Sequence, residues 1–169
     1  SEVSEELDID LEITGPIKVR LWISSSAKDT DFTVKLIDWF PATDEYVDGM
    51  AINITDSIIR TRFRNGWDNE ELMVPGTPYL IEFKLFPTSN IFKENHRIRI
   101  DVSSSNWPRF DVNPNTGGKI GIDKSSMCAE QTVYHNQDKP SCIVLPIQPS
   151  RHLILPDPSM GYIGSPTGI

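Results

Sequence analysis

The sequence predicts an all-β protein, a β-sandwich of the jelly-roll type, from three observations. Apolar and charged residues alternate with period two over several short segments, as they do in strands with one buried and one solvated face. No amphipathic helix longer than two turns is found, and the 13 prolines suit a protein that is not helical. Residues that favour turns separate the alternating segments, at 14–16, 48–50, 65–67, 75–78 and 115–118.

In the first half of the chain, the clearest strand covers residues 17–24, where apolar side chains share one face and Lys18 and Arg20 lie on the other. Segment 32–36 repeats this pattern with Phe32 on its apolar face. The alternation is weaker elsewhere, and it predicts further strands at 7–13, 50–54 and 58–64.

In the second half, residues 79–86 and 97–102 alternate as clearly as any in the chain. Weaker strands are expected at 130–135, 142–147 and 152–155, the first two as a hairpin around the turn "NQDKP". The inward faces of all these strands predict a core that includes Val19, Leu21, Val34, Leu36, Ile81, Phe83, Ile98, Ile100 and Val144.

The length of 169 residues predicts one domain, covering 1–150, followed by an extended tail at 151–169 that is rich in Pro, Gly and Ser. The formal charge of −8 argues against nucleic acid and against an anionic membrane surface as partners. Neither an apolar run of about 18 residues nor a signal sequence is present. A cytoplasmic location is favoured, although the sequence does not fix it.

A search for catalytic residues predicts none. The G-x-S-x-G motif of a nucleophile elbow is absent, and no serine is placed beside a histidine and an acid by the pattern of strands. The three histidines, His96, His135 and His152, are expected at turns or strand edges.

No metal or cofactor is predicted either. Cys128, His135 and Cys142 do not have the spacing of a zinc site, and both cysteines are expected to be free and mostly buried. Asp29 and Asp31 offer oxygen ligands that calcium prefers, but a solvated turn with Asp29 accepting backbone N–H bonds is the favoured interpretation.

The loop "SSSNWPRFDVNPNTGG", residues 103–118, is the most unusual segment. A long loop with its own aromatic residues is typically functional or packed against another part of the protein. Its candidate interface residues, which would face another domain or form the wall of a substrate pocket, are Trp107, Arg109, Phe110, Asn113 and Asn115. Packing of Trp107 and Phe110 into the core beneath the loop is the main alternative, and a ligand site is the third.

Four motifs in a fixed order carry a resemblance to a known family: "ITGPIKVRLWISSSAKDTDFTVKLIDWFP", "IIRTRFR", "VPGTPYLIEFKLFPTSNIFKENHRIRIDVSSSNWPRFDVNPNTG" and "QTVYHNQDKPSCIVLPI". Together they make residues 7–150 resemble the C-terminal domain of the Xaa-Pro dipeptidyl-peptidase and cocaine-esterase family of serine hydrolases. Such domains usually carry Gly where Asn95 precedes His96. Because Asn tolerates positive φ, we expect the turn to be kept.

The resemblance implies a jelly-roll sandwich similar to galactose-binding domains, without any member of the Ser-Asp-His triad. The triad would lie in an upstream α/β-hydrolase domain of the same protein, which would be the partner of this chain and would hydrolyse amide or ester bonds. The chain would help to shape the substrate pocket, and it would also be compatible with a homo-oligomer.

The alternative function is a free-standing carbohydrate-binding module, by analogy with galactose-binding sandwiches. Such a site needs exposed aromatic platforms, for which the candidates are Trp22, Trp39, Trp67 and Trp107.

Overall fold

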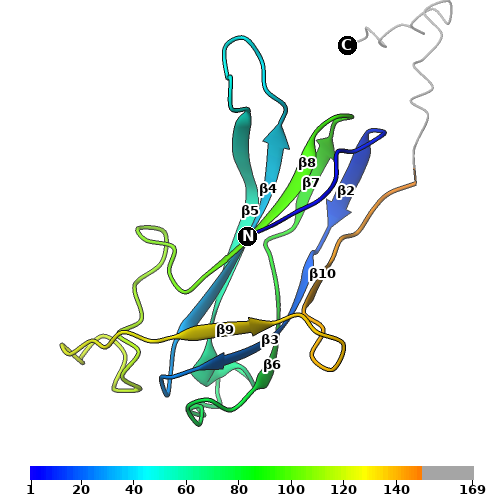
Figure 1. Cartoon of the computed structure of the whole chain (residues 1–169). Helices are drawn as coiled ribbons and strands as arrows, with labels where there is room; N and C mark the ends of the chain where they lie inside the picture. Colours follow the sequence, from blue (N-terminus) through cyan, green and yellow to red (C-terminus); the bar gives the residue numbers. More distant parts are fainter. Residues whose placement is uncertain (150–169) are drawn as a thin grey trace, which may run out of the picture.

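The computed structural model describes residues 1–149, which form two facing layers of antiparallel strands (Figure 1). The all-β class and the sandwich are therefore confirmed, whereas the jelly-roll subtype stays a prediction. The first layer is a four-stranded sheet in the order β1, β8, β4, β5. Its strands are β1 (Glu2–Val3), β8 (Arg97–Ser103), β4 (Asp31–Phe40) and β5 (Met50–Arg60).

The second layer has a bent central strand made of β2 (Leu11–Gly15) and β3 (Lys18–Ser25). The bend lies at Gly15, whose φ of 129° is one that residues with a side chain rarely adopt. On one side, β3 pairs with β6 (Tyr79–Lys84) and β2 pairs with β7 (Thr88–Phe92). The backbone N–H of Leu85 donates to the carbonyl of Ile17 at 3.0 Å, so the two pairs form one continuous layer.

The other side of this central strand is lined by β9 (Gln131–Tyr134) and β10 (Cys142–Val144), both antiparallel to β3. The predicted hairpin of these two segments is wrong. His135 does bridge to Pro140, but β9 pairs with the end of β3 and β10 with its beginning, so the two strands run one after the other along the same edge. Ser141 closes the gap between them by accepting a hydrogen bond from the backbone N–H of Trp22.

One hydrophobic core joins the layers. It contains residues from β2, β3, β4, β5, β6 and β7, with the largest fully buried side chains at Phe32 and Phe92. Among the predicted core residues, five are buried: Val19, Leu21, Val34, Leu36 and Ile81. Three others are half-buried and pack against the core: Phe83, Ile98 and Ile100.

The prediction for Val144 is wrong, because this side chain is 50% exposed. Val144 pairs with Lys18, and directly opposed residues point to the same face, which for Lys18 is the solvated one. The same register places Cys142 beside Arg20 on the outer face. Both cysteines are free, as predicted, but they are exposed and not buried.

The expected strands 50–54 and 58–64 are one strand, β5, which ends in a 3₁₀-helix at Thr61–Phe63. Asn95 has a φ of 66°, so the turn before β8 is kept with Asn in place of Gly. The expected strand 152–155 and the predicted tail lie outside the described residues. No helix within residues 1–149 is long and apolar enough to cross a membrane.

Candidate docking surface

The loop that follows β8 rests on a buried pair of carboxylates at the start of β4. In the β4–β5 register Asp31 lies opposite Arg60, which donates from Nε and one terminal nitrogen to the two carboxylate oxygens, both at 2.9 Å. This hydrogen bonding raises the pKa of Arg60 above its usual value. Asp29 is fully buried and accepts 2.9 Å and 3.0 Å hydrogen bonds from the Nε and backbone N–H of Arg62.

The solvated turn predicted around Asp29 is therefore wrong. Besides the two bonds from Arg62, its carboxylate accepts hydrogen bonds from Thr61 Oγ1 and Asn113 Nδ2. A buried carboxylate needs such donors, because an unpaired buried charge is very costly. Among residues 1–149 no group of three or more His, Cys, Asp or Glu side chains is placed to hold a metal ion.

Asn113 connects the loop to this network. Its side-chain amide donates to Asp29 Oδ2 at 3.0 Å and to Asp31 Oδ1 at 2.7 Å, and the residue is only 4% exposed. Its own Oδ1 accepts the backbone N–H of Asn115, which has a φ of 65°. Asn113 thus holds the loop from beneath and is not part of its outer surface, whereas Asn115 is half-buried and donates from Nδ2 to the carbonyl of Met127 at 3.0 Å.

A second anchor lies at the start of the loop, on β5. Asp56 is 2% exposed and accepts a 3.0 Å hydrogen bond from Asn106 Nδ2. The Nε of Arg109 lies 3.0 Å from the other oxygen of Asp56. The guanidinium of Arg109 also lies 5.7 Å from the ring centres of Phe86 and Phe110, a distance at which cations are attracted to aromatic faces.

Between these anchors the loop presents apolar area to solvent. Trp107 is 70% exposed, Phe86 is 53% exposed and Phe110 is half-buried. Trp107 therefore does not pack into the core beneath the loop. We refer to Phe86, Trp107, Arg109 and Phe110 as the Trp107 surface.

A pocket of about 260 Å³ borders the Trp107 surface. Phe110 and Asp111 from the loop form one wall, and Ile58 on β5 and Phe63 with Trp67 form the other. Trp67 is 79% exposed and its ring centre lies 5.9 Å from that of Phe63. Trp67 thus adds a second exposed indole next to the loop. Trp22 and Trp39, the two other aromatic platforms that were considered, are half-buried in their strands.

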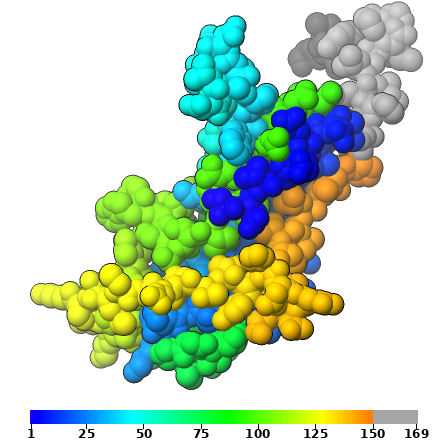
Figure 2. All heavy atoms as spheres, viewed as in Figure 1, coloured from blue at the N-terminus to red at the C-terminus, as the bar shows by residue number. Residues whose placement is uncertain are grey.

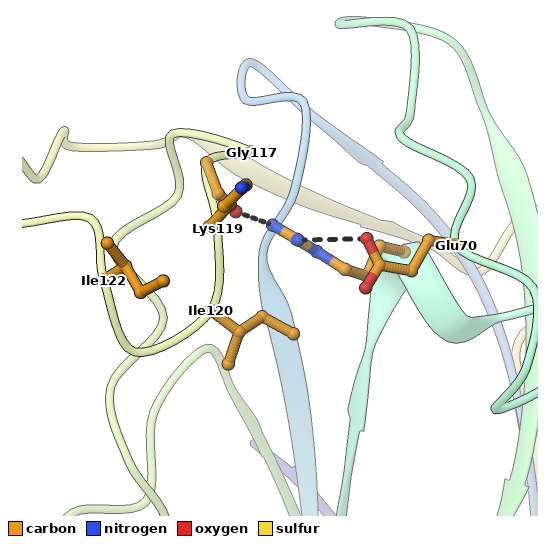
Figure 3. Close-up of a pocket in the computed structure, with 7 residues that line it drawn as sticks. Glu70, Gly117, Lys119, Ile120 and Ile122 are labelled. Atoms are coloured by element: carbon orange, nitrogen blue, oxygen red, sulfur yellow. Dashed lines mark hydrogen bonds and ion pairs between the residues drawn. The ribbon is translucent and has the colours of Figure 1, made fainter.

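A larger pocket, of about 580 Å³, lies at the other end of the loop (Figure 3). One terminal nitrogen of Arg62 donates to the carbonyl of Gly118 at 2.9 Å, and the other lies 3.5 Å from the carboxylate of Glu70. Ile120 and Ile122 come from the loop side. Arg62 therefore connects the buried Asp29 to the backbone of the loop.

Catalytic groups are not assembled in the described chain. His96 lies at the start of β8, as predicted, but it is buried, with Nδ1 2.8 Å from Asp38 Oδ1 and its ring against Phe40. His135 lies at the turn after β9, and His152 lies outside the described residues. Within residues 1–149 no serine, threonine or cysteine side chain is hydrogen-bonded to a histidine.

The sequence did not lead us to predict the buried ion pairs beneath the loop, which join Asp31 to Arg60 and Asp29 to Arg62. A signal for them was present, because Asp29 and Asp31 alternate with period two, as do Arg60 and Arg62. Opposite charges of matching period on two strands are typical of cross-strand pairs.

Comparison with known proteins agrees with the resemblance of the motifs. Residues 2–144 match the family described as the X-Pro dipeptidyl-peptidase C-terminal non-catalytic domain. A cocaine esterase of Rhodococcus sp. (strain MB1 Bresler) is 44% identical over 146 residues, which are 85% of this chain and 24% of the esterase.

Solved structures similar to this chain are also parts of longer hydrolases and peptidases. An alpha-amino acid ester hydrolase shares 30% identity with a TM-score of 0.79, over 86% of this chain and 25% of the hydrolase. An aminopeptidase from the marine sediment archaeon Thaumarchaeota archaeon shares 29% identity with a TM-score of 0.81, over 87% of this chain and 25% of the aminopeptidase. None of these proteins is named as a carbohydrate-binding module, so that alternative has no support. This chain spans about a quarter of the length of each relative, and it belongs to the family of X-Pro dipeptidyl-peptidase C-terminal non-catalytic domains.

Proposed function

We propose that this chain packs against an upstream α/β-hydrolase domain of the same protein through the Trp107 surface and helps to shape its substrate pocket. The observation that carries the proposal is the exposure of Trp107 on a loop that is itself firmly anchored. Trp and Arg are the residues that most often dominate binding energy at interfaces, and here Trp107 and Arg109 are both exposed on the same loop.

The anchoring supports this role because it lowers the cost of binding. The loop is fixed at Asp56 by Asn106, at Asp29 and Asp31 by Asn113, and at Gly118 by Arg62. A side chain carried by an ordered loop loses less conformational entropy on association than one carried by a mobile loop. The exposed apolar area is thus preorganised for a partner.

The proposed activity of the whole protein is hydrolysis of ester or amide bonds by a serine nucleophile in the upstream domain. The relatives are named as an esterase, an ester hydrolase and an aminopeptidase, and all of them are about four times as long as the part that this chain matches. Acyl transfer to a serine followed by hydrolysis serves both ester and amide substrates. In this scheme the chain contributes contacts and no catalytic group.

The test compares Trp107→Ala in this chain and in the full-length protein. In the chain alone we expect the free energy of unfolding to change by less than about 0.5 kcal/mol, because the side chain is exposed. In the full-length protein, loss of an interface anchor should cost about 2 kcal/mol or more of stability, or change KM for an ester substrate.

The matched control is Tyr46→Ala, an exposed aromatic residue in the connection between β4 and β5, at the opposite end of the molecule from the loop (Figure 1). It should leave both forms unchanged. If Trp107→Ala destabilises the isolated chain by several degrees in Tm, the side chain serves the local fold and the docking proposal fails.

A further inference from the structure

The sandwich is open along one side, between β8 in the first layer and β9 and β10 in the second. At the centre of the sandwich the inward side chains of β3 and β4 are fully buried. At this side the inward residues of both layers are only half-buried. They are Ile98, Ile100 and Val102 on β8, and Val133, Ile143 and Leu145 on the opposite layer.

These six side chains, with Leu21 at the bottom, line a groove of about 590 Å³. Ser1 and Glu2 also line the groove, and Glu2 lies directly opposite Ile100. Figure 2 shows the N-terminal end in blue on the face of the molecule above the yellow to orange segment that holds β9 and β10. A groove with half-buried aliphatic side chains on both walls is the interior of a sandwich that lacks one covering element.

A covering strand could pair with the free part of the β8 edge, next to β1. Strand β1 pairs with β8 only through Glu2 with Ile100 and Val3 with Arg99, while β8 continues to Ser103. The backbone N–H of Ser4 donates to the carbonyl of Ile98 at 2.9 Å. In an antiparallel ladder every second residue turns its N–H and C=O to the same side, so those of Val102 also face the β1 edge.

The register between β1 and β8 can be continued to residues that precede Ser1. Since Glu2 lies opposite Ile100, the residue that precedes Ser1 in a longer protein would lie opposite Val102. Directly opposed residues share a face of the sheet, and Val102 faces the groove. The first residue before Ser1 would therefore point into the groove, and the second, opposite Ser103 at the end of β8, would point away from it.

We infer that the segment immediately preceding Ser1 in the full-length protein extends β1 along β8 and fills this groove with its alternate side chains. We expect an apolar residue at the first position before Ser1. The inference rests on membership of a family whose relatives are about four times longer, and not on the proposed role of the Trp107 surface. A covalently attached segment also has a high effective concentration at the groove, which a separate partner lacks.

The test compares this chain with the same chain extended by the residues that precede Ser1 in the full-length protein, and with the full-length protein itself. One measurement is hydrogen exchange of the Val102 amide. We expect it to slow by at least tenfold in both longer forms, because the amide gains a strand partner. The amide of Ile81, a fully buried residue of β6 that does not line the groove, serves as the internal reference.

The second measurement uses an engineered thiol in a background that carries Cys128→Ser and Cys142→Ser. Val133→Cys places a thiol in the groove, and its reaction with a maleimide should slow by at least tenfold in the longer forms. Thr132→Cys is the matched control, because Thr132 is the neighbouring residue of β9 and is exposed on the outer face. Its thiol should react at the same rate in all forms.

Unchanged exchange at Val102 together with unchanged reactivity at Val133→Cys in the longer forms would overturn the inference. A second result would also overturn the inference: protection of Val102 and of Val133→Cys that rises with protein concentration and is the same with and without the upstream residues. This result would mean that a second copy of the chain pairs at this edge. Trp107→Ala should change neither the hydrogen exchange of Val102 nor the reactivity of Val133→Cys. A failure of this inference can therefore be distinguished from a failure of the docking proposal.

Discussion

Arg62 Nε lies 2.9 Å from Asp29 Oδ2 in a buried ion pair, with the two side chains 5% and 0% exposed. The pair joins the start of β4 to the 3₁₀-helix after β5, and through Arg62 it reaches the carbonyl of Gly118 in the long loop. One arginine thus connects the sandwich to the segment that carries the Trp107 surface.

The first prediction concerns the loss of this arginine. Arg62→Met leaves Asp29 buried without its ionic partner, and breaking a buried pair in this way costs about 3–5 kcal/mol. Urea unfolding at neutral pH should show the loss as a lower midpoint. The control is Arg20→Ala, which removes an exposed pair with Glu82 and should cost about 0–1 kcal/mol. Equal costs for the two variants would contradict the structural role of Arg62.

The second prediction concerns the anchor of the loop. Asn113→Ala removes the amide that bridges Asp29 and Asp31, and hydrogen bonds to charged groups contribute about 1.5–3 kcal/mol. We expect a loss of stability of this order, together with faster proteolytic cleavage within residues 119–127. Asn69→Ala, at an exposed position near the same end of the molecule, should change neither property. If cleavage within residues 119–127 is unaltered in Asn113→Ala, another contact holds this segment.

The sequence predicted the fold well because alternation with period two is a local property. Segments 17–24 and 97–102 needed no information about their partners to be recognised as strands. The order of pairing is not local, and this is where the prediction was wrong. The turn around residues 136–140 looks the same whether the flanking segments pair with each other or both pair with β3.

The candidate site was predicted only in outline for the same reason. Trp107 and Arg109 could be selected from residue type alone, and the structure places both at the surface of the loop. The burial of Asn113 depends on the register that brings Asp31 opposite Arg60, and this register follows from the pairing of β4 and β5 over their whole length. A loop residue that bonds to two buried carboxylates cannot be recognised before that pairing is known.

The third prediction is that this chain alone is not labelled by a fluorophosphonate probe. An activated serine needs a base within hydrogen-bond reach, and within residues 1–149 no serine side chain is hydrogen-bonded to His96 or to His135. Labelling is measured by intact mass after incubation at neutral pH, with a known serine esterase as the positive control. Stoichiometric labelling of one serine would show that the chain has a nucleophile of its own.

The last prediction concerns Asp10, which links the N-terminal segment to the turn between β7 and β8. Hydrogen bonds from Lys93 and from the backbone N–H of Glu94 hold the pKa of Asp10 below its usual value of 3.8. The folded state therefore binds a proton at Asp10 less readily than the unfolded state does. The resulting stabilisation is fully present only well above pH 3.8, and it is lost as the pH falls through the lowered pKa of the folded state.

Asp10→Asn should consequently reduce stability at pH 7, and the difference from the natural sequence should shrink as the pH falls well below 3.8. Urea unfolding of both proteins over this pH range measures the difference, which cancels the titration of all other carboxylates. Asp8→Asn is the control for removal of a carboxylate from the same segment, because the exposed Asp8 side chain makes no hydrogen bond within residues 1–149, and it should change stability little at pH 7. A difference for Asp10→Asn that stays constant from pH 7 to pH 2 would mean that the charge of Asp10 does not stabilise this turn.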